Sequence, residues 1–167
     1  MVEWLYLELN NKKLRINKND SMDIYTWRET KTKPSYWFKI KINFHIEKYG
    51  YKNYIININK KQYRLSRIIY KAHNKDWDIK DNSNLNWIDH INRDSTDNRI
   101  ENLRILTNQQ NQWNTNAKGY CWDNLANKWR SQIRLNGKVK HLGYFEKEKE
   151  EDAHIAYLKA KEVYHKM

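Results

Sequence analysis

The segment 88–111, IDHINRDSTDNRIENLRILTNQQN, restricts the possible folds of this chain more than any other. Residues 87–91 and 103–106 have the length and apolar content of short strands. The residues between them are rich in Asn, Asp, Arg and Ser, which favour turns. We therefore expect two strands joined by a turn-rich loop.

A helix is predicted directly after the second strand. Thr107 and Gln110 have the Thr-x-x-Gln spacing of a capping box, which places Asn111 in the first helical turn. The order strand, loop, strand, helix then brings Asn111 back toward Asp89 and His90, at the end of the first strand.

Asp89, His90 and Asn111 carry side chains suited to phosphodiester hydrolysis. Carboxylate and amide oxygens are hard ligands of the kind that Mg²⁺ accepts, and a neighbouring His can take a proton from water near neutral pH. An Asp-His pair by itself is more often structural or solvated, so the spacing alone leaves both interpretations open.

The charge of the chain points to a polyanionic partner. The 167 residues carry a formal net charge of +12, and the 23 Trp, Tyr and Phe side chains supply enough apolar area for compact folding. No apolar run approaches the roughly 20 residues of a membrane span, and the N-terminus lacks the features of a signal peptide. We expect an intracellular protein without a membrane partner. The single cysteine, Cys121, excludes a Cys-rich zinc site and is expected to be a buried residue on a strand.

The N-terminal third of the chain reads as strands followed by a helix. Alternating apolar residues predict strands at 36–42 and 53–63, and the spacing of Leu65, Ile68 and Ile69 predicts a helix over 65–74. After residue 117 the composition changes, because three of the four glycines lie in this last part. Strands are predicted at 118–123, 128–135 and 138–145, with an Asn-Gly turn at 136–137, followed by an amphipathic helix that buries one face. That face is expected to contain Ala153, Ala156, Tyr157, Ala160, Val163 and Tyr164.

Residues 88–114 resemble the His-Asn-His (HNH) homing endonucleases, a ββα-metal nuclease family, over IDHINRD…DNRIENLRILTNQQNQWN. The resemblance implies that Asp89 and Asn111 bind one divalent metal ion, Mg²⁺ or alternatively Mn²⁺, and that His90 is the general base. It places Asn102 in the same catalytic set, where it braces the loop and orients the His. Asp97 and Asn98 match the turn of the loop and are expected to be structural. For Arg67, in the preceding helix, a phosphate contact and a salt bridge are both open.

The second predicted strand of the C-terminal module has one basic face. Lys128, Arg130, Gln132 and Arg134 alternate with Trp129, Ser131, Ile133 and Leu135, which the helix can cover. Lys138 and Lys140 are expected to extend the basic face. Residues 116–147 carry seven Lys or Arg against two acidic residues, a net charge of +5, so DNA contact is favoured over an ordinary solvated face. For Trp122, core packing is favoured over base contact.

Residues 117–166 resemble the Apetala-type (ethylene-responsive-factor-like) DNA-binding domain, over KGYCWDNLANKWRSQIRLNGKVKHLGYF and EDAHIAYLKAKEVYH. That family contacts the major groove with its three-stranded sheet. The resemblance extends the predicted DNA-contacting set to eight residues: Lys118, Lys128, Arg130, Gln132, Arg134, Lys138, Lys140 and His141.

The expected architecture is α+β, in three parts. A β-rich region (1–63) leads into an HNH core (64–116), and a three-stranded antiparallel sheet packed on one helix follows (117–167). The predicted function is a metal-dependent, site-specific DNA endonuclease of the homing type, a monomer or weak dimer that nicks double-stranded DNA. The alternative is a DNA-binding regulator derived from such a nuclease that does not cleave. An RNA-binding module lacks a recognisable aromatic motif.

Overall fold

The computed structural model describes residues 1–165, which form two compact units, Met1–Ile105 and Leu106–Met167, the latter described as far as residue 165. Residues 166–167, the end of the predicted C-terminal domain, lie outside the described part. The mixture of antiparallel sheets and few helices agrees with the predicted α+β class. No helix within residues 1–165 combines the length and apolar character needed to cross a membrane.

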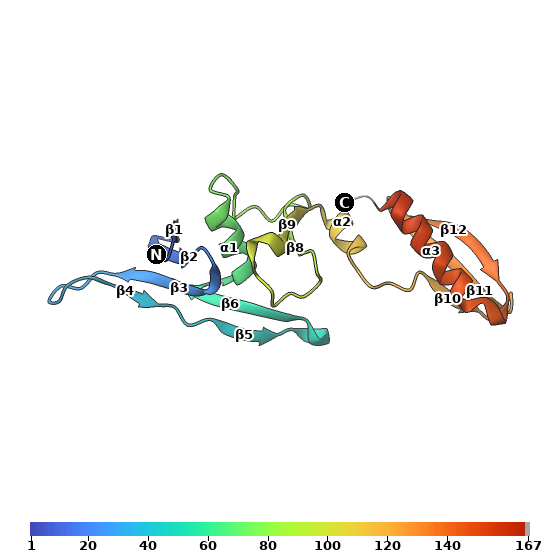
Figure 1. Cartoon of the computed structure of the whole chain (residues 1–167), viewed down its shortest axis with the longest axis horizontal. Coiled ribbons are helices and arrows are strands. Elements are labelled where there is room, and N and C mark those ends of the chain that lie inside the picture. The colour runs from blue at the N-terminus through green and yellow to red at the C-terminus, as the bar shows by residue number, and fades with distance from the viewer. Residues whose placement is uncertain (166–167) are drawn as a thin grey trace. The chain divides into compact units, whose positions relative to one another are not determined.

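The first unit begins with a four-stranded sheet in the order β1-β2-β3-β4. Its strands are β1 (Trp4–Leu9), β2 (Lys12–Asn17), β3 (Asp20–Arg28) and β4 (Tyr36–Lys39), each antiparallel to the next. Strands β3 and β4 form a long hairpin that projects from this sheet (Figure 1). Strand residues alternate between the two faces, so the side chains of Leu14, Ile16 and Ile24 all enter the core, where they are almost fully buried.

A three-stranded sheet and a helix complete the main core of the first unit. The sheet contains β5 (Asn43–Ile46), β6 (Lys52–Ile58) and β7 (Lys61–Arg64), and a short 3₁₀ turn, η1 (Lys48–Gly50), joins its first two strands. Helix α1 (Leu65–His73) follows β7 and buries Leu65, Ile68 and Ile69 as its spacing predicted.

The predicted strand at 36–42 is shorter than expected, and the one at 53–63 is divided into two. The first ends at Lys39, and Ile40 and Ile42 then pack against the core in the connection to β5. The second contains a hairpin turn at Asn59 and Lys60, with φ values of 47° and 65°. Asn tolerates this left-handed conformation, so a tight turn forms without glycine.

Strands β8 (Trp87–His90) and β9 (Leu103–Leu106) form a separate two-stranded sheet. The loop between them ends in the 3₁₀ turn η2 (Ile100–Asn102). The two strands lie within the predicted ranges 87–91 and 103–106.

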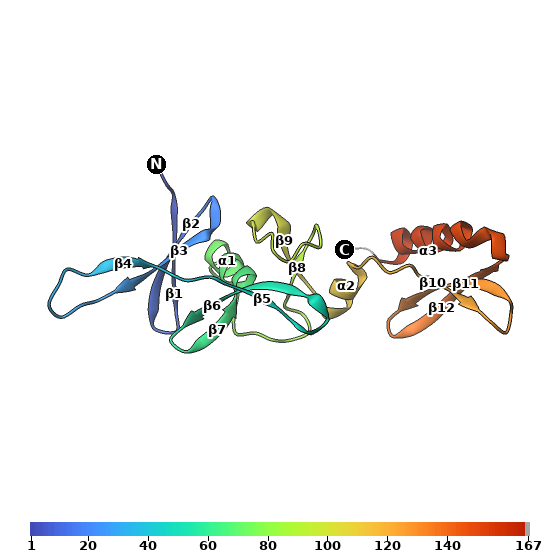
Figure 2. The ribbon, with the colours of Figure 1, turned by 90° about the horizontal axis from the view of Figure 1, so that it is seen from below.

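The second unit contains α2 (Asn108–Trp113), followed by a three-stranded antiparallel sheet and α3 (Glu150–Tyr164). Thr107 and Gln110 form the predicted capping box at the start of α2. The sheet comprises β10 (Tyr120–Asp123), β11 (Lys128–Leu135) and β12 (Lys138–Phe145), and the 3₁₀ turn η3 (Lys147–Lys149) leads into α3. Helix α3 runs along one face of this sheet (Figure 2), where Tyr157 and Ala160 pack against Ile133.

Close packing between the sheet and α3 explains Gly119. Its φ is +73°, and a Cβ at this position would lie 1.9 Å from the ring of Tyr157. Only glycine allows this approach.

Three predictions about the second unit are wrong. Cys121 lies on β10 but is exposed, because its register with Arg130 places it on the face opposite α3. Val163 and Tyr164 are 60% and 39% exposed, so the buried face of α3 is narrower than expected. Its buried residues are Ala153, Tyr157 and Ala160.

Candidate active site and nucleic-acid interface

Asp89 and His90 form the buried end of β8. They are 6% and 9% exposed, so neither is a solvated surface residue. The Oδ2 atom of Asp89 accepts a hydrogen bond from Nε of Arg104, on β9, at 2.8 Å. This pairing across the two-stranded sheet gives a buried carboxylate a charged partner, as burial of an ionised group requires.

His90 contacts Asn98, a loop residue that is 4% exposed. The distance from Nε2 of His90 to Oδ1 of Asn98 is 3.2 Å, and Nδ2 of Asn98 donates to the carbonyl of Thr96. Because Nδ2 of Asn98 donates to this carbonyl, the atom of Asn98 that faces the imidazole is Oδ1. An amide oxygen only accepts hydrogen bonds, so Nε2 of His90 must carry the proton. Asn98 therefore favours the tautomer in which Nδ1 carries the lone pair.

Asn102 fastens the loop that carries Asn98. Its Oδ1 accepts from the backbone N–H of Asn92, and its Nδ2 donates to Oδ1 of Asn92 and to the carbonyl of Asp97. All three distances are between 2.8 and 3.0 Å. The resemblance implied this bracing role for Asn102. Direct orientation of His90 by Asn98 was not predicted, because Asn98 was expected to be a turn residue only.

The loop gains a further clamp from Asp97 and Arg99. Nε and Nη2 of Arg99 donate to the two carboxylate oxygens of Asp97 at 2.9 and 2.8 Å. This hydrogen bonding lowers the pKa of Asp97 from 3.8 to about 2. The loop is thus held by side-chain contacts over most of its length.

A cleft of about 500 Å³ opens beside His90 in the first unit. Cationic side chains of Lys61, Arg64 and Lys80 line it, together with Trp87. A cleft lined by these cations and by the buried His90 suits a polyanionic substrate chain.

Arg67 also borders this cleft, but its guanidinium donates hydrogen bonds to backbone carbonyls of the same unit. Nη2 donates to the carbonyls of Ile79 and Asp81 at 2.7 and 2.9 Å, and Nη1 donates to the carbonyl of Asn86. Burial lowers the pKa of Arg67. Neither of the two roles left open for Arg67 describes these contacts: it binds backbone carbonyls and fixes the loop before β8.

The donor chemistry of Asp89 fits a divalent cation such as Mg²⁺, because a carboxylate oxygen is a hard ligand. Among residues 1–165, no three His, Cys, Asp or Glu side chains gather into a group that could bind a metal. A cation at Asp89 would therefore need amide or backbone oxygens, waters and substrate oxygens as its other ligands. Asn111 lies on α2, in the second unit, and its pairing with Asp89 stays a prediction.

The sheet face opposite α3 carries five of the eight predicted DNA-contacting residues, including Lys128 at the start of β11. Arg130, Gln132 and Arg134 alternate on β11, and His141 pairs with Gln132 across β12. Ser131 and Ile133, on the other face, are 0% and 2% exposed. The predicted alternation of β11 is therefore present.

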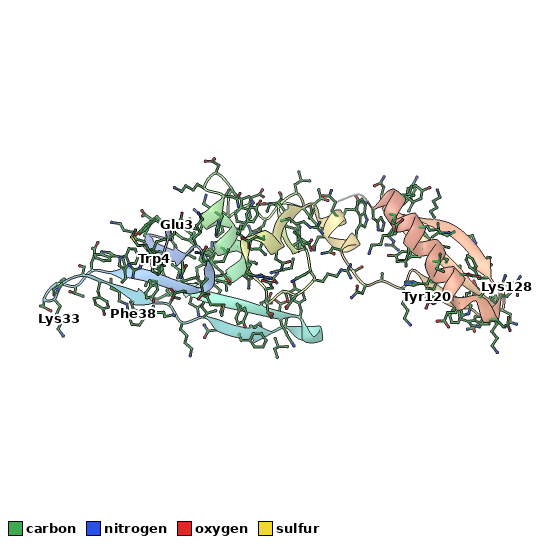
Figure 3. The ribbon with its side chains drawn as sticks, in the orientation of Figure 1. Glu3, Trp4, Lys33, Phe38, Tyr120 and Lys128 are labelled. Atoms are coloured by element: carbon green, nitrogen blue, oxygen red, sulfur yellow. The ribbon has the colours of Figure 1, made fainter. Side chains whose placement is uncertain are left out.

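Two of these basic side chains already have acidic partners. Lys128, at the start of β11 (Figure 3), donates to Glu146 at 2.7 Å, and Nη1 of Arg130 lies 3.3 Å from Asp123. Hydrogen bonding to Cys121 and the nearby Asp123 raise the pKa of Arg130. A phosphate or base at these positions would compete with the internal partners.

Lys138 and Lys140 do not extend this basic face, contrary to expectation. They pair with Leu135 and Ile133, which puts them on the α3 side of the sheet, and Nζ of Lys140 donates to Oη of Tyr164 on α3 at 2.5 Å. Lys118 precedes β10 and is exposed. Trp122 is half-buried and packs edge-on against Trp129, outside the core cluster around Ile133, so core packing for Trp122 stays a prediction.

Residues 63–113 match the family model described as HNH endonuclease. This segment contains Asp89, His90, Asn102 and Asn111, and the match supports an HNH nuclease domain that acts on DNA. No curated protein and no solved structure matches the chain.

Proposed function

We propose that this chain is a metal-dependent, site-specific DNA endonuclease of the homing type, with His90 as the general base. The observation that carries the proposal is the buried Asp89–His90 pair at the end of β8, with Nε2 of His90 3.2 Å from Oδ1 of Asn98. This pair lies inside the segment that matches the HNH endonuclease model.

His90 takes a proton from the attacking water at Nδ1, while Nε2–H remains directed at Asn98. The resulting hydroxide attacks the scissile phosphorus and the bond from phosphorus to the 3′ oxygen breaks. The leaving oxygen takes a proton from solvent, which gives a 5′-phosphate and a 3′-hydroxyl. Asn102 acts through the loop, as a positioning residue.

Asp89 would supply one ligand to the divalent metal, and Asn111 is proposed as the second ligand on the resemblance alone. When bound, Mg²⁺ or Mn²⁺ would stabilise negative charge on the phosphate and on the leaving oxygen. Arg104 holds the Asp89 carboxylate in place from β9.

DNA binding is assigned to the sheet of the second unit, as in the Apetala-type domains that it resembles. Arg130, Gln132, Arg134 and His141 on the face opposite α3 would approach base edges or phosphates, and Lys118 would add a phosphate contact. One active site per chain cuts one strand, so a monomer nicks duplex DNA. A double-strand break needs two copies or two successive cuts.

Plasmid nicking tests the proposal. Supercoiled plasmids, including candidate target sites, are incubated with the chain and Mg²⁺ or Mn²⁺, alongside His90→Ala and the exposed-site control Asn84→Ala. We expect open-circular product from the wild type and from the control, and a loss of about 100-fold or more for His90→Ala. If the wild type binds DNA but leaves every plasmid intact, the chain is a non-cleaving DNA-binding regulator. Unchanged nicking by His90→Ala would show that the base is another group.

A further inference from the structure

The four-stranded sheet β1–β4 has an unusual outer face. Cross-strand register aligns Tyr6, Arg15, Tyr25 and Lys39 in one row, so these side chains share a face. Leu14 and Ile24, which alternate with them, point into the core. The row therefore lies on the face turned away from the core.

Five aromatic side chains occupy this outer face around one arginine: Trp4, Tyr6, Tyr25, Trp27 and Trp37. The guanidinium of Arg15 lies 4.4, 4.8 and 4.9 Å from the ring centroids of Trp4, Tyr25 and Trp37. Among the described residues, the buried Nε of Arg15 has no hydrogen-bond partner. Cation–π contacts with these rings therefore hold the Arg15 guanidinium in place.

The rings also contact one another. Trp27 lies edge-on to Trp37 with centroids 5.3 Å apart, and Tyr6 lies 6.1 Å from Trp37. Tyr6 is 59% exposed, and the other four rings are partly exposed. A solvated sheet face needs no such rings for folding. Large rings grouped with an arginine are instead typical of recognition surfaces.

The charge around this face indicates the class of partner. Residues 1–42 contain nine Lys or Arg against five Asp or Glu, a net charge of +4. Two of these nine, Lys31 and Lys33, lie at the tip of the β3–β4 hairpin, and Lys33 marks its far end (Figure 3). A basic rim beside partly exposed rings complements a chain that has both phosphates and flat apolar groups.

We propose that the outer face of β1–β4 binds unpaired nucleotides of a single-stranded nucleic acid. Aromatic side chains stack on bases only where the bases are unstacked from a duplex, and stacking accepts any base. Tyr6 and its neighbouring rings receive the bases, Arg15 keeps the rings in place, and the lysines of the hairpin contact phosphates. This surface is separate from the His90 site. It would let the proposed nuclease bind a single strand in addition to cleaving DNA.

Fluorescence anisotropy of the full chain tests this proposal. The probe is fluorescein-labelled oligo-dT of about 20 nucleotides, longer than the sites of many single-strand-binding folds. EDTA prevents cleavage, so binding is measured independently of nuclease activity. The main variant is Tyr6→Ser, because an exposed ring can be removed without opening the core. Tyr36→Ser is the matched control, since Tyr36 is 45% exposed on β4 but faces the opposite way from Trp37. Thermal melting verifies that both variants are folded.

We expect Tyr6→Ser to weaken oligo-dT binding by about tenfold, the loss of one stacked base. Tyr36→Ser should change it less than twofold, and duplex binding should be unaffected by either variant. Equal losses on oligo-U would extend the site to RNA, whereas a loss on oligo-dT alone would restrict it to DNA. Oligo-dT affinity unchanged in Tyr6→Ser, or an equal loss on duplex DNA, would overturn the proposal. Neither result would bear on the His90 nuclease site, which plasmid nicking tests separately.

Discussion

Asn98→Ala is the sharpest test of how the candidate active site is organised. The substitution removes the Oδ1 that faces Nε2 of His90 and the Nδ2 that donates to Thr96. Because Asn98 is 4% exposed, water does not readily replace these contacts. We expect the free energy of unfolding to fall by about 2 kcal/mol, the usual loss when buried polar groups lose a partner.

The effect on cleavage should be smaller than that of removing the base. Without Asn98, the Nε2–H tautomer of His90 loses a hydrogen bond of about 1 kcal/mol, which corresponds to roughly a fivefold lower nicking rate. His90→Ala should lower the rate by about 100-fold or more, because general-base catalysis itself is lost. The initial rate of plasmid nicking at saturating protein measures both, and chemical denaturation measures stability.

Asn84→Ala, an exposed asparagine before β8, is the matched control and should change neither quantity. Two results would refute the reasoning. If Asn98→Ala nicks as slowly as His90→Ala, Asn98 contacts the reacting groups and does more than orient the imidazole. If stability falls but nicking is unchanged, the contact between Asn98 and His90 does not select the reactive tautomer.

Three further predictions concern other contacts. Arg67→Met should lower the free energy of unfolding by about 3 kcal/mol, because three carbonyls lose a charged donor; an unchanged urea midpoint would contradict this. The lowered pKa of Asp97 means that its ion pair with Arg99 stabilises the fold above pH 4 and is lost as the pH falls toward 2. After allowance for solvent screening, this loss is about 1 kcal/mol in acid titration and should be absent in Asp97→Asn. Arg134→Ala should reduce the slope of the logarithm of the duplex-binding constant against the logarithm of salt concentration by about one. Lys140→Ala should leave this slope unchanged, because Lys140 is directed at α3.

Local patterns in the sequence predicted the elements around the site well. The capping box of Thr107 and Gln110, the helical spacing from Leu65 and the alternation of β11 are each encoded by neighbouring residues. These signals depend on local backbone geometry alone, so they can be recognised in the sequence without knowledge of the tertiary structure.

The placement of Lys138 and Lys140 could also have been predicted. A two-residue turn at Asn136-Gly137 puts Leu135 directly opposite Lys138, and paired residues share a face. The error came from extending the alternation of β11 through the turn. A β-bulge between Ser131 and Gln132 then inserts Leu142 into β12, which lets His141 stay outward while Leu142 packs on the core.

The roles of Arg67 and Asn98 could not be read from the sequence. Arg67 binds carbonyls 12 to 19 residues further along the chain, in a loop without a recognisable pattern. Asn98 meets His90 only because the loop folds back on β8. Such contacts depend on the tertiary path of loops, and one sequence contains no periodic signal for that path.

The order of strands within the sheets has a consequence for how this chain folds. In all four sheets, each strand pairs with the one that precedes or follows it in the sequence. Such meanders have low contact order, and little loop-closure entropy must be lost before strand pairs form. The sheet of the second unit, in particular, needs only residues 120–145 to pair its strands. Strand pairing within each sheet can therefore begin without residues from the other sheets.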